Sequence, residues 1–178
     1  MLRCALRTIA ALLQPSPMSD LTIGSLAPAF TTTAVGGEYG GGTAVSLADF
    51  HGRTVVLYFY PKDDTPSCTQ QACGLRDAWT QFEKRAAVFG VSIDPAKRHA
   101  KFIAKYALPF PLLADESRAV VAAYGVWVEK SLYGRKYMGA ERSTFIIGPG
   151  GKIRAILCKV KPADHAAQLL AALAADFR

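Results

Sequence analysis

The sequence predicts an α/β fold in which helices flank a central mixed β-sheet. Two continuous runs of β-branched and aromatic residues, at 54–61 and 86–94, are typical of strands buried on both faces. Between them, apolar residues recur at helical spacing over 69–85. Two further strand runs around a Gly-Pro-Gly-Gly turn indicate a hairpin at 143–158. Strands that alternate with helices and are followed by a hairpin predict one layered domain.

The other elements are inferred from turn residues and local periodicity. A glycine-rich turn within 27–50 separates two short strands. Pro95 is expected at the first helical position of a helix that runs to about Tyr106, because proline is favoured there. The remaining predicted elements are a short strand at 111–115, a short helix at 116–124, an extended segment at 124–130 and a final helix at 162–177.

Composition and charge narrow the class of protein. The 178 residues carry a net charge of +7, from 21 basic and 14 acidic residues. The basic residues are scattered among acidic and apolar ones, which argues against a nucleic-acid interface. No run reaches the roughly 18 apolar residues of a membrane span, so we expect a cytoplasmic protein without membrane association. The chain lacks a C-x2-C pair and its histidines are dispersed, so no metal site is predicted.

The first 17 residues differ from the rest of the chain. They contain two arginines, no acidic residue and a short apolar stretch, and a second methionine follows them. We interpret 1–17 as an N-terminal extension, and favour an upstream start or a disordered segment over an organellar presequence. Cys4 would then have no part in the function. Residues 19–178 are expected to form the single domain.

Two of the four cysteines lie five positions apart in the segment YPKDDTPSCTQQACG, residues 60–74. Cys68 falls where a strand gives way to a helix, so free helix N–H groups and the positive end of the macrodipole would stabilise its thiolate. The thiolate is the reactive form of cysteine. Thr65 can donate its hydroxyl to the sulfur or to a bound oxygen. A redox or nucleophilic role is therefore predicted, against the alternative that both cysteines are buried packing residues.

Cleavage of a peroxide O–O bond suits such a thiolate, because an arginine can hold the charge that builds on the leaving oxygen. Arg142, at the start of the predicted hairpin, is the candidate arginine. An oxidised Cys68 would be a sulfenic acid, which condenses with a nearby thiol such as that of Cys73. Cys158 is instead predicted to pack in the core or at a sheet edge.

The spacing of the two cysteines constrains how they can react with each other. Five residues of helix rise about 7.5 Å, whereas the Cα atoms of a disulfide usually lie within about 7 Å. Positions i and i+5 also point in different directions. We therefore expect the first turns of the helix to unwind when a disulfide forms.

The segment FYPKDDTPSCTQQAC resembles the active-site signature of the peroxiredoxins, and more narrowly that of the PrxQ or bacterioferritin comigratory protein subfamily. Pro61, Thr65 and Cys68 match the pattern Pro-x3-Thr-x2-Cys, and Cys73 matches the subfamily's second cysteine. Further similarity lies in the opening G-x-x-A-P-x-F motif and in the segment YGVWVEKSLYGRKYMGAERSTFII. The resemblance covers the chain from about residue 19 to its C-terminus.

This resemblance implies a thioredoxin-like fold and thiol-dependent reduction of hydrogen peroxide and organic hydroperoxides, an antioxidant activity. Cys68 would be the peroxidatic cysteine and Cys73 the resolving cysteine of the same chain, the atypical 2-Cys arrangement with a Cys68–Cys73 redox disulfide. Thr65 and Arg142 would position and polarise the peroxide, and Pro61 would shape the pocket. Thioredoxin or a similar dithiol would reduce the disulfide. The resemblance also implies a monomer that needs no metal, haem or flavin.

Several residues near the motif have less certain roles. Ser67 stands where the subfamily usually has glycine, and would be strained if that position required a positive φ. Gln71 can accept a hydrogen bond from an arginine without supplying charge. Asp63 is interpreted as a turn-forming residue, and His99 and His165 as solvated helix residues.

Two other functions fit the sequence less well than that of a thiol peroxidase. A thiol–disulfide exchange enzyme on the same fold typically carries C-x-x-C, which this chain lacks. A binding module that uses the basic surface would need no reactive cysteine, and the motif at 60–74 makes it the weakest of the three.

Overall fold

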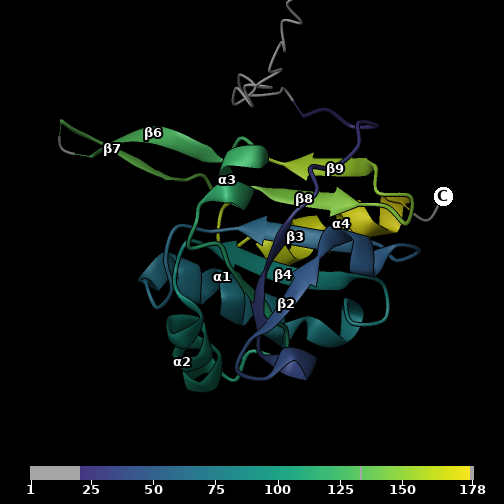
Figure 1. Ribbon diagram of the computed structural model, residues 1–178, viewed down its shortest axis with the longest axis horizontal. Helices are drawn as coiled ribbons and strands as arrows, with labels where there is room; N and C mark the ends of the chain where they lie inside the picture. The colour runs from purple at the N-terminus through teal and green to yellow at the C-terminus, as the bar shows by residue number, and fades with distance from the viewer. Residues whose placement is uncertain (1–20, 133, 177–178) are drawn as a thin grey trace, which may run out of the picture.

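The structure is a computed structural model that describes residues 21–132 and 134–176 (Figure 1). Its centre is a mixed sheet in which β3, β4 and β5 run parallel and their neighbours pair antiparallel. In sheet order the strands are β2 (Thr43–Ser46), β1 (Thr31–Val35), β5 (Leu112–Ala114), β4 (Ala87–Ser92), β3 (Val55–Phe59), β8 (Thr144–Ile147) and β9 (Ile153–Leu157). The predicted α/β class with a mixed sheet flanked by helices is confirmed.

Strand β3 lies inside the sheet and is buried along its whole length. Because successive side chains of a strand point to opposite faces, Val55 and Leu57 enter one hydrophobic core while Val56 and Tyr58 enter the other. The continuous apolar run at 54–61 therefore reflects burial on both sides, as the sequence indicates.

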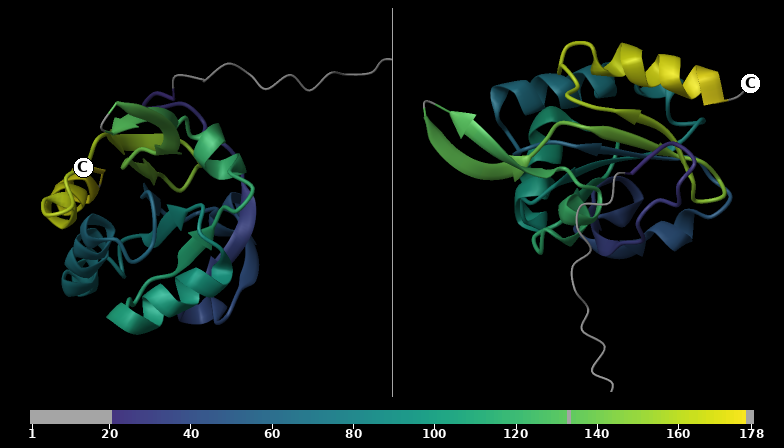
Figure 2. Two further views of the ribbon diagram at one scale, coloured as in Figure 1. Left: turned by 90° about the vertical axis from the view of Figure 1, so that its left-hand side faces the viewer. Right: turned by 90° about the horizontal axis from the view of Figure 1, so that it is seen from above.

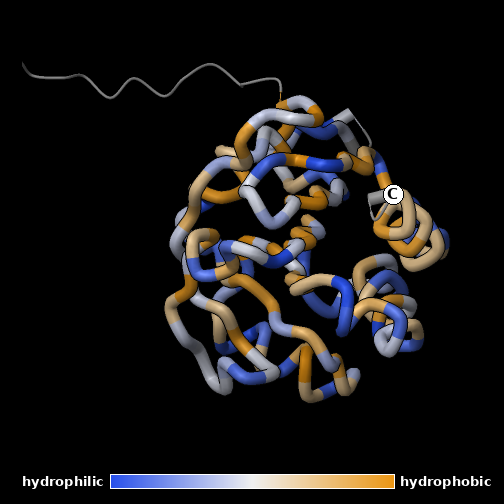
Figure 3. Tube along the Cα trace, turned by 90° about the vertical axis from the view of Figure 1, so that its right-hand side faces the viewer, coloured by the Kyte–Doolittle hydropathy of each residue, from blue (hydrophilic) through white to orange (hydrophobic). Residues whose placement is uncertain are grey.

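The helices divide between the two faces of the sheet. They are α1 (Pro66–Asp77), α2 (Ala96–Tyr106), α3 (Ala119–Ala123) and α4 (His165–Asp176), with 3-10 turns η1 (Gly37–Tyr39), η2 (Leu47–Phe50) and η3 (Trp79–Gln81). Leu75 of α1, Phe102 of α2 and Leu169 of α4 share the core that contains Tyr58, whereas Val120 of α3 belongs to the other core. Helices α1 and α4 lie side by side on their face (Figure 2), and α4 is hydrophobic along most of its length (Figure 3).

Several element boundaries differ from the sequence prediction, most clearly those of the first two helices. The helix predicted at 69–85 is α1, which starts at Pro66, ends at Asp77 and is followed by η3. After Asp77 the chain changes direction. Phe82 is then buried, and the ring centroid of Trp79 lies 5.5 Å from that of Phe110. Pro95 is not the first helical residue; its ψ of 154° is extended, so it caps α2 from outside.

A second hairpin was not predicted in full. The segment at 124–130 was expected to be extended, and β6 (Trp127–Leu132) does lie there. It pairs antiparallel with β7 (Arg135–Ala140), a mostly exposed strand that periodicity did not indicate. The hairpin projects from the body of the molecule and leads back to β8 (Figure 1).

Three further predictions concern Cys158, the N-terminal extension and membrane association. Cys158 lies just beyond the end of β9, the edge strand of the sheet, and its side chain is exposed. Of the two predicted alternatives, packing in the core is wrong and a position at the sheet edge is confirmed. The proposed extension at 1–17, with Cys4, lies outside the described residues. In the part of the chain that the structure describes, no helix is long and apolar enough to cross a membrane.

The interpretation of His99 and His165 as solvated residues is also wrong, since neither has any solvent exposure. Helical spacing alone did not distinguish these buried positions. In α4, Nε2 of His165 lies 2.9 Å from Oγ1 of Thr144 in β8, and Nδ1 lies 3.0 Å from the amide nitrogen of Gln71 in α1. Burial, assisted by the nearby positive charge of Arg142, lowers the pKa of His165 to about 4.

We predict that His165 makes the fold lose stability on acidification. Its folded pKa of about 4 lies below the unfolded value of 6.5, so the unfolded chain binds the extra proton first. The contribution is complete above pH 6.5 and falls by roughly 3 kcal/mol as the pH drops from 6.5 to 4. Urea unfolding across this range should show a shallower pH dependence in His165→Gln than in the wild type. His51→Gln, at an exposed position, is the control, and equal slopes in wild type and His165→Gln would contradict the prediction.

Candidate active site

Cys68 is the third residue of α1 and only 3% of its surface is exposed. The chain leaves β3 at Phe59, makes a turn and enters the helix at Pro66. The N–H groups of a helix's first turn have no intrahelical acceptors, so they and the macrodipole favour a negative charge at this end. The sulfur is therefore withdrawn from bulk water and placed where a thiolate is stabilised.

Arg142 reaches Cys68 from the segment between β7 and β8. Its Nη2 donates to Sγ of Cys68 at 3.5 Å, and its Nη1 donates to Oε1 of Gln71, one turn further along α1. The expectation that Gln71 accepts a hydrogen bond from an arginine is confirmed. The guanidinium thus joins the start of β8 to the first turns of α1, although the two segments are 74 residues apart in sequence.

The orientation of this guanidinium is set by a chain of hydrogen bonds. Because Oε1 of Gln71 faces Arg142, its amide nitrogen faces Nδ1 of His165 and must donate to it. Nε2 of His165 then carries the ring proton and donates to Thr144 Oγ1. A neutral imidazole is the form that burial favours, and its unprotonated Nδ1 can accept the amide hydrogen of Gln71.

Thr65 and Pro61 flank Cys68 on the turn side. Thr65 is the N-cap residue of α1, and its backbone carbonyl accepts the N–H of Thr69 at 2.8 Å. Its hydroxyl donates to the carbonyl of Lys62 at 3.1 Å, and not to the sulfur as one alternative anticipated. The lone pairs of Thr65 Oγ1 remain able to accept a hydrogen bond from a bound substrate. Pro61 is half-buried two residues after the end of β3.

Ser67 carries no backbone strain. It lies on the exposed side of the first turn of α1 and is not among the residues with positive φ. The position therefore does not require glycine in this chain.

Lys130 of β6 is a second cation near the site that the sequence analysis did not single out. Burial lowers its pKa, and the positive charge of Arg142 lowers it further, while the charges of Glu141 and Cys68 act in the opposite direction. The Lys130 ammonium donates to the carbonyl of Ala140 at 2.5 Å. The sequence places several basic residues on this hairpin, but it does not indicate which of them lies near Cys68.

Cys73 lies on α1 and is half-buried, and like Cys68 it is a free thiol. At 100° per residue, the two side chains leave the helix axis about 140° apart and are separated by roughly 7.5 Å of rise. A disulfide between them therefore requires the helix to change. Within residues 21–132 and 134–176, no group of three His, Cys, Asp or Glu side chains could hold a metal ion.

Comparison with known proteins agrees with this geometry. The AhpC/TSA family matches residues 23–156. A putative peroxiredoxin of the Bcp type from Coxiella burnetii is 46% identical over 155 residues, 86% of this chain and 99% of that protein. Peroxiredoxin Bcp of Bacillus subtilis is 46% identical over 133 residues, 74% of this chain and 85% of its own.

A solved structure shares both fold and sequence. It is that of the Xanthomonas campestris bacterioferritin comigratory protein, described for its alkyl peroxide reduction activity. It superposes with a TM-score of 0.76 at 38% identity and covers 84% of this chain and 92% of its own. With the family match and the identity to the Bcp proteins, this chain belongs to the AhpC/TSA family, within its Bcp and PrxQ group of thioredoxin-fold peroxiredoxins.

Proposed function

We propose that this chain reduces hydrogen peroxide and organic hydroperoxides with Cys68 as the peroxidatic cysteine and Cys73 as the resolving cysteine. The observation that carries the assignment is the contact between Arg142 Nη2 and Cys68 Sγ, at a buried helix N-terminus. A structural cysteine has no need of a guanidinium, whereas a thiolate that attacks a peroxide needs a cation beside both the sulfur and the leaving oxygen.

In the first step the Cys68 thiolate attacks the terminal peroxide oxygen. An S–O bond forms as the O–O bond breaks, the sulfur supplies two electrons, and the product oxygen leaves as hydroxide or alkoxide and takes up a proton. Arg142 is placed to stabilise charge on the sulfur and on the oxygens in line with it. Thr65 Oγ1, whose own hydrogen is donated to the carbonyl of Lys62, accepts a hydrogen bond from the bound peroxide. Pro61 bounds the pocket on the turn side.

In the second step the thiol of Cys73 attacks the sulfenic acid of Cys68, which forms a disulfide and releases water. The opposed directions of the two side chains support a local unwinding of the first turns of α1 before this bond can form. Reduction of the disulfide by an external dithiol closes the cycle.

The reductant is a thiol donor, and we propose thioredoxin or a similar protein dithiol. We further propose that residues 19–178 act as one monomeric domain in the cytoplasm. In support, the family match covers residues 23–156, and the exposed large hydrophobic side chains are few among the described residues. Size-exclusion chromatography with light scattering tests the monomer.

Substitution of either cysteine should separate the two halves of the cycle. Cys68→Ser removes the attacking sulfur, so peroxide consumption should cease. Cys73→Ser should consume one equivalent of peroxide, trap Cys68 as the sulfenic acid and fail to turn over with thioredoxin. Dimedone labelling followed by mass spectrometry identifies the trapped species. Peroxide turnover at the wild-type rate by Cys68→Ser would refute the assignment, and Cys158→Ser is the matched control.

Replacing the arginine should slow the first step selectively. Arg142→Lys keeps a positive charge, but a single ammonium cannot bridge Gln71 and Cys68 as the planar guanidinium does. We expect the second-order rate constant for oxidation by hydrogen peroxide to fall by about 10²-fold or more. Stopped-flow fluorescence measures it, with Arg154→Lys as a matched arginine on β9. An unchanged rate constant would remove Arg142 from the mechanism.

Disulfide formation should be visible in the helix itself. The backbone amides of 69–75 should be protected from hydrogen exchange in the reduced protein and lose protection in the oxidised protein. The strands β3 and β4 should keep theirs, because they lie in the middle of the sheet. Equal protection of α1 in both states would show that the bond forms without unwinding.

A further inference from the structure

The turn at 60–65, which precedes Cys68, contains an aspartate that has no solvent exposure. Oδ1 of Asp63 accepts the hydroxyl of Tyr60 at 2.6 Å, and Oδ2 lies 2.7 Å from Nδ1 of His99 in α2. Both members of the Asp63–His99 pair are fully buried. An exposed turn residue would need none of these partners.

The backbone of the same residue is also fixed. The N–H of Asp63 donates to Oδ2 of Asp94 at 2.7 Å, and its carbonyl accepts Nη2 of Arg98 at 3.0 Å. Asp94 is itself held by the hydroxyl of Ser92 at 2.9 Å and by Nε of Arg98 at 3.2 Å. Side chain and backbone of one turn residue are thus bound to the end of β4 and to the first turn of α2.

The protons of the buried pair follow from its neighbours. Nε2 of His99 lies 3.2 Å from the carbonyl of Leu113, which can only accept, so Nε2 carries a proton. Nδ1 faces Oδ2 of Asp63, and the other carboxylate oxygen already accepts from Tyr60. His99 therefore bridges the turn to β5, and loss of its ring would leave a buried carboxylate short of a donor.

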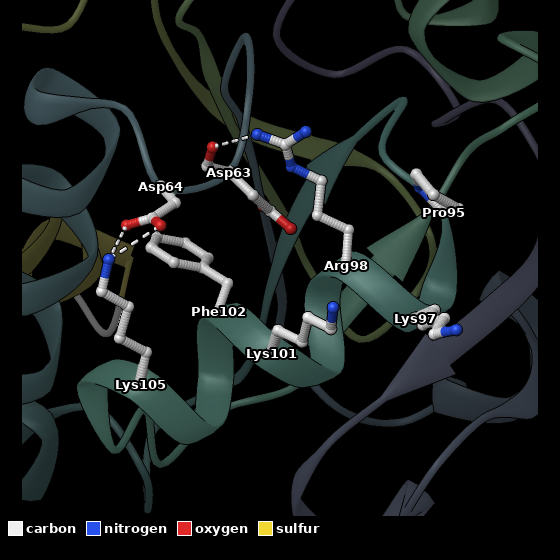
Figure 4. A pocket seen from close by; sticks show the side chains of 8 residues that line it. All are labelled: Asp63, Asp64, Pro95, Lys97, Arg98, Lys101, Phe102 and Lys105. Atoms are coloured by element: carbon white, nitrogen blue, oxygen red, sulfur yellow. Dashed lines mark hydrogen bonds and ion pairs between the residues drawn. The ribbon is translucent and has the colours of Figure 1, made fainter.

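The next residue is bound to the other end of the same helix. Asp64 has a left-handed φ of 58°, which a non-glycine residue adopts only when its surroundings hold it. Its carboxylate accepts the ammonium of Lys105 at 2.8 and 2.9 Å and the hydroxyl of Tyr106 at 2.6 Å. A pocket of about 420 Å³ lies between the turn and α2, with Asp64, Lys105 and Arg98 on its rim (Figure 4).

Helix α2 also contacts the C-terminal end of α1, the helix that carries Cys68. Nη1 of Arg76, in the last turn of α1, donates to the carbonyl of Tyr106 at 2.8 Å. The turn before Cys68 and the end of α1 beyond Cys73 are therefore both fixed to α2, and the segment between them is left to rearrange.

We propose that Asp63 and His99, with Asp64, Lys105 and Tyr106, are positioning residues for peroxide reduction. They clamp the turn at 60–65 to α2 and so hold the Thr65 hydroxyl at a constant distance from Cys68. This inference rests on the proposed role of Thr65 as a peroxide-binding residue. It predicts that the turn keeps its place while α1 unwinds, and that loosening the clamp slows attack on peroxide more than it slows other reactions of the same thiolate.

The test compares two reactions of Cys68. Oxidation by hydrogen peroxide requires a positioned substrate, whereas alkylation by iodoacetamide requires only an accessible thiolate. In His99→Leu the oxidation rate constant should fall by about 10²-fold, since an ångström of misplacement costs this much, while alkylation should change by less than about threefold. Stopped-flow fluorescence and timed mass spectrometry measure the two rates. Circular dichroism confirms that the variant is folded.

Two further variants keep the test decisive. Tyr106→Phe removes a single hydroxyl from Asp64 at the solvent-facing end of the clamp, and should slow oxidation by a few-fold with alkylation unchanged even if His99→Leu does not fold. Lys101→Gln, which lines the same pocket and makes no hydrogen bond to the turn among the described residues, should leave both rates unchanged.

Measuring Thr65→Val in parallel separates this inference from the proposed function. If Thr65→Val oxidises at the wild-type rate, the proposed peroxide site is wrong. If Thr65→Val is slow but folded clamp variants oxidise normally, or if their oxidation and alkylation fall by the same factor, the clamp is a structural feature only and the inference is overturned.

Discussion

The candidate active site depends on one contact, the hydrogen bond between the guanidinium of Arg142 and the sulfur of Cys68. The sheet brings the two residues together, because Arg142 precedes β8 and Cys68 follows β3, and these two strands are antiparallel neighbours. Helix α4 completes the arrangement by placing His165 against Gln71. The mixed sheet and its covering helices thus bring into contact segments that lie far apart in sequence, and the chemistry of the site is a consequence of that packing.

In the proposed cycle, the same site must be rigid for one step and flexible for the next. Attack on peroxide needs fixed donors around a buried sulfur, whereas disulfide formation needs two side chains on opposite sides of a helix to meet. The fold divides these demands between elements. The turn before α1 and the last turn of α1 are both fixed to α2, so the change can be confined to the few turns that contain Cys68 and Cys73. A helix of twelve residues is short enough to reform after each cycle.

Local signals were sufficient for most strands, the main helices and the cysteine motif, because each is encoded by neighbouring residues. The failures concern residues whose environment is set by distant segments. His165 contacts Gln71 across 94 positions, and His99 contacts Asp63 across 36. Helical spacing shows on which side of a helix such a residue lies, but not whether another segment supplies a hydrogen-bond partner on that side. Strand β7 was not predicted for a related reason. It is mostly exposed, so its pairing with β6 defines it, and not a pattern of buried residues.

The uncharged state of the residues behind the arginine has a consequence for the electrostatics of the pocket. Had a glutamate stood at position 71, its carboxylate would have neutralised the guanidinium and drawn a proton onto the imidazole behind it. Gln71 and His165 orient Arg142 without counterbalancing it. The guanidinium is therefore held against the sulfur by neutral partners, so the scaffold fixes its orientation without reducing its charge.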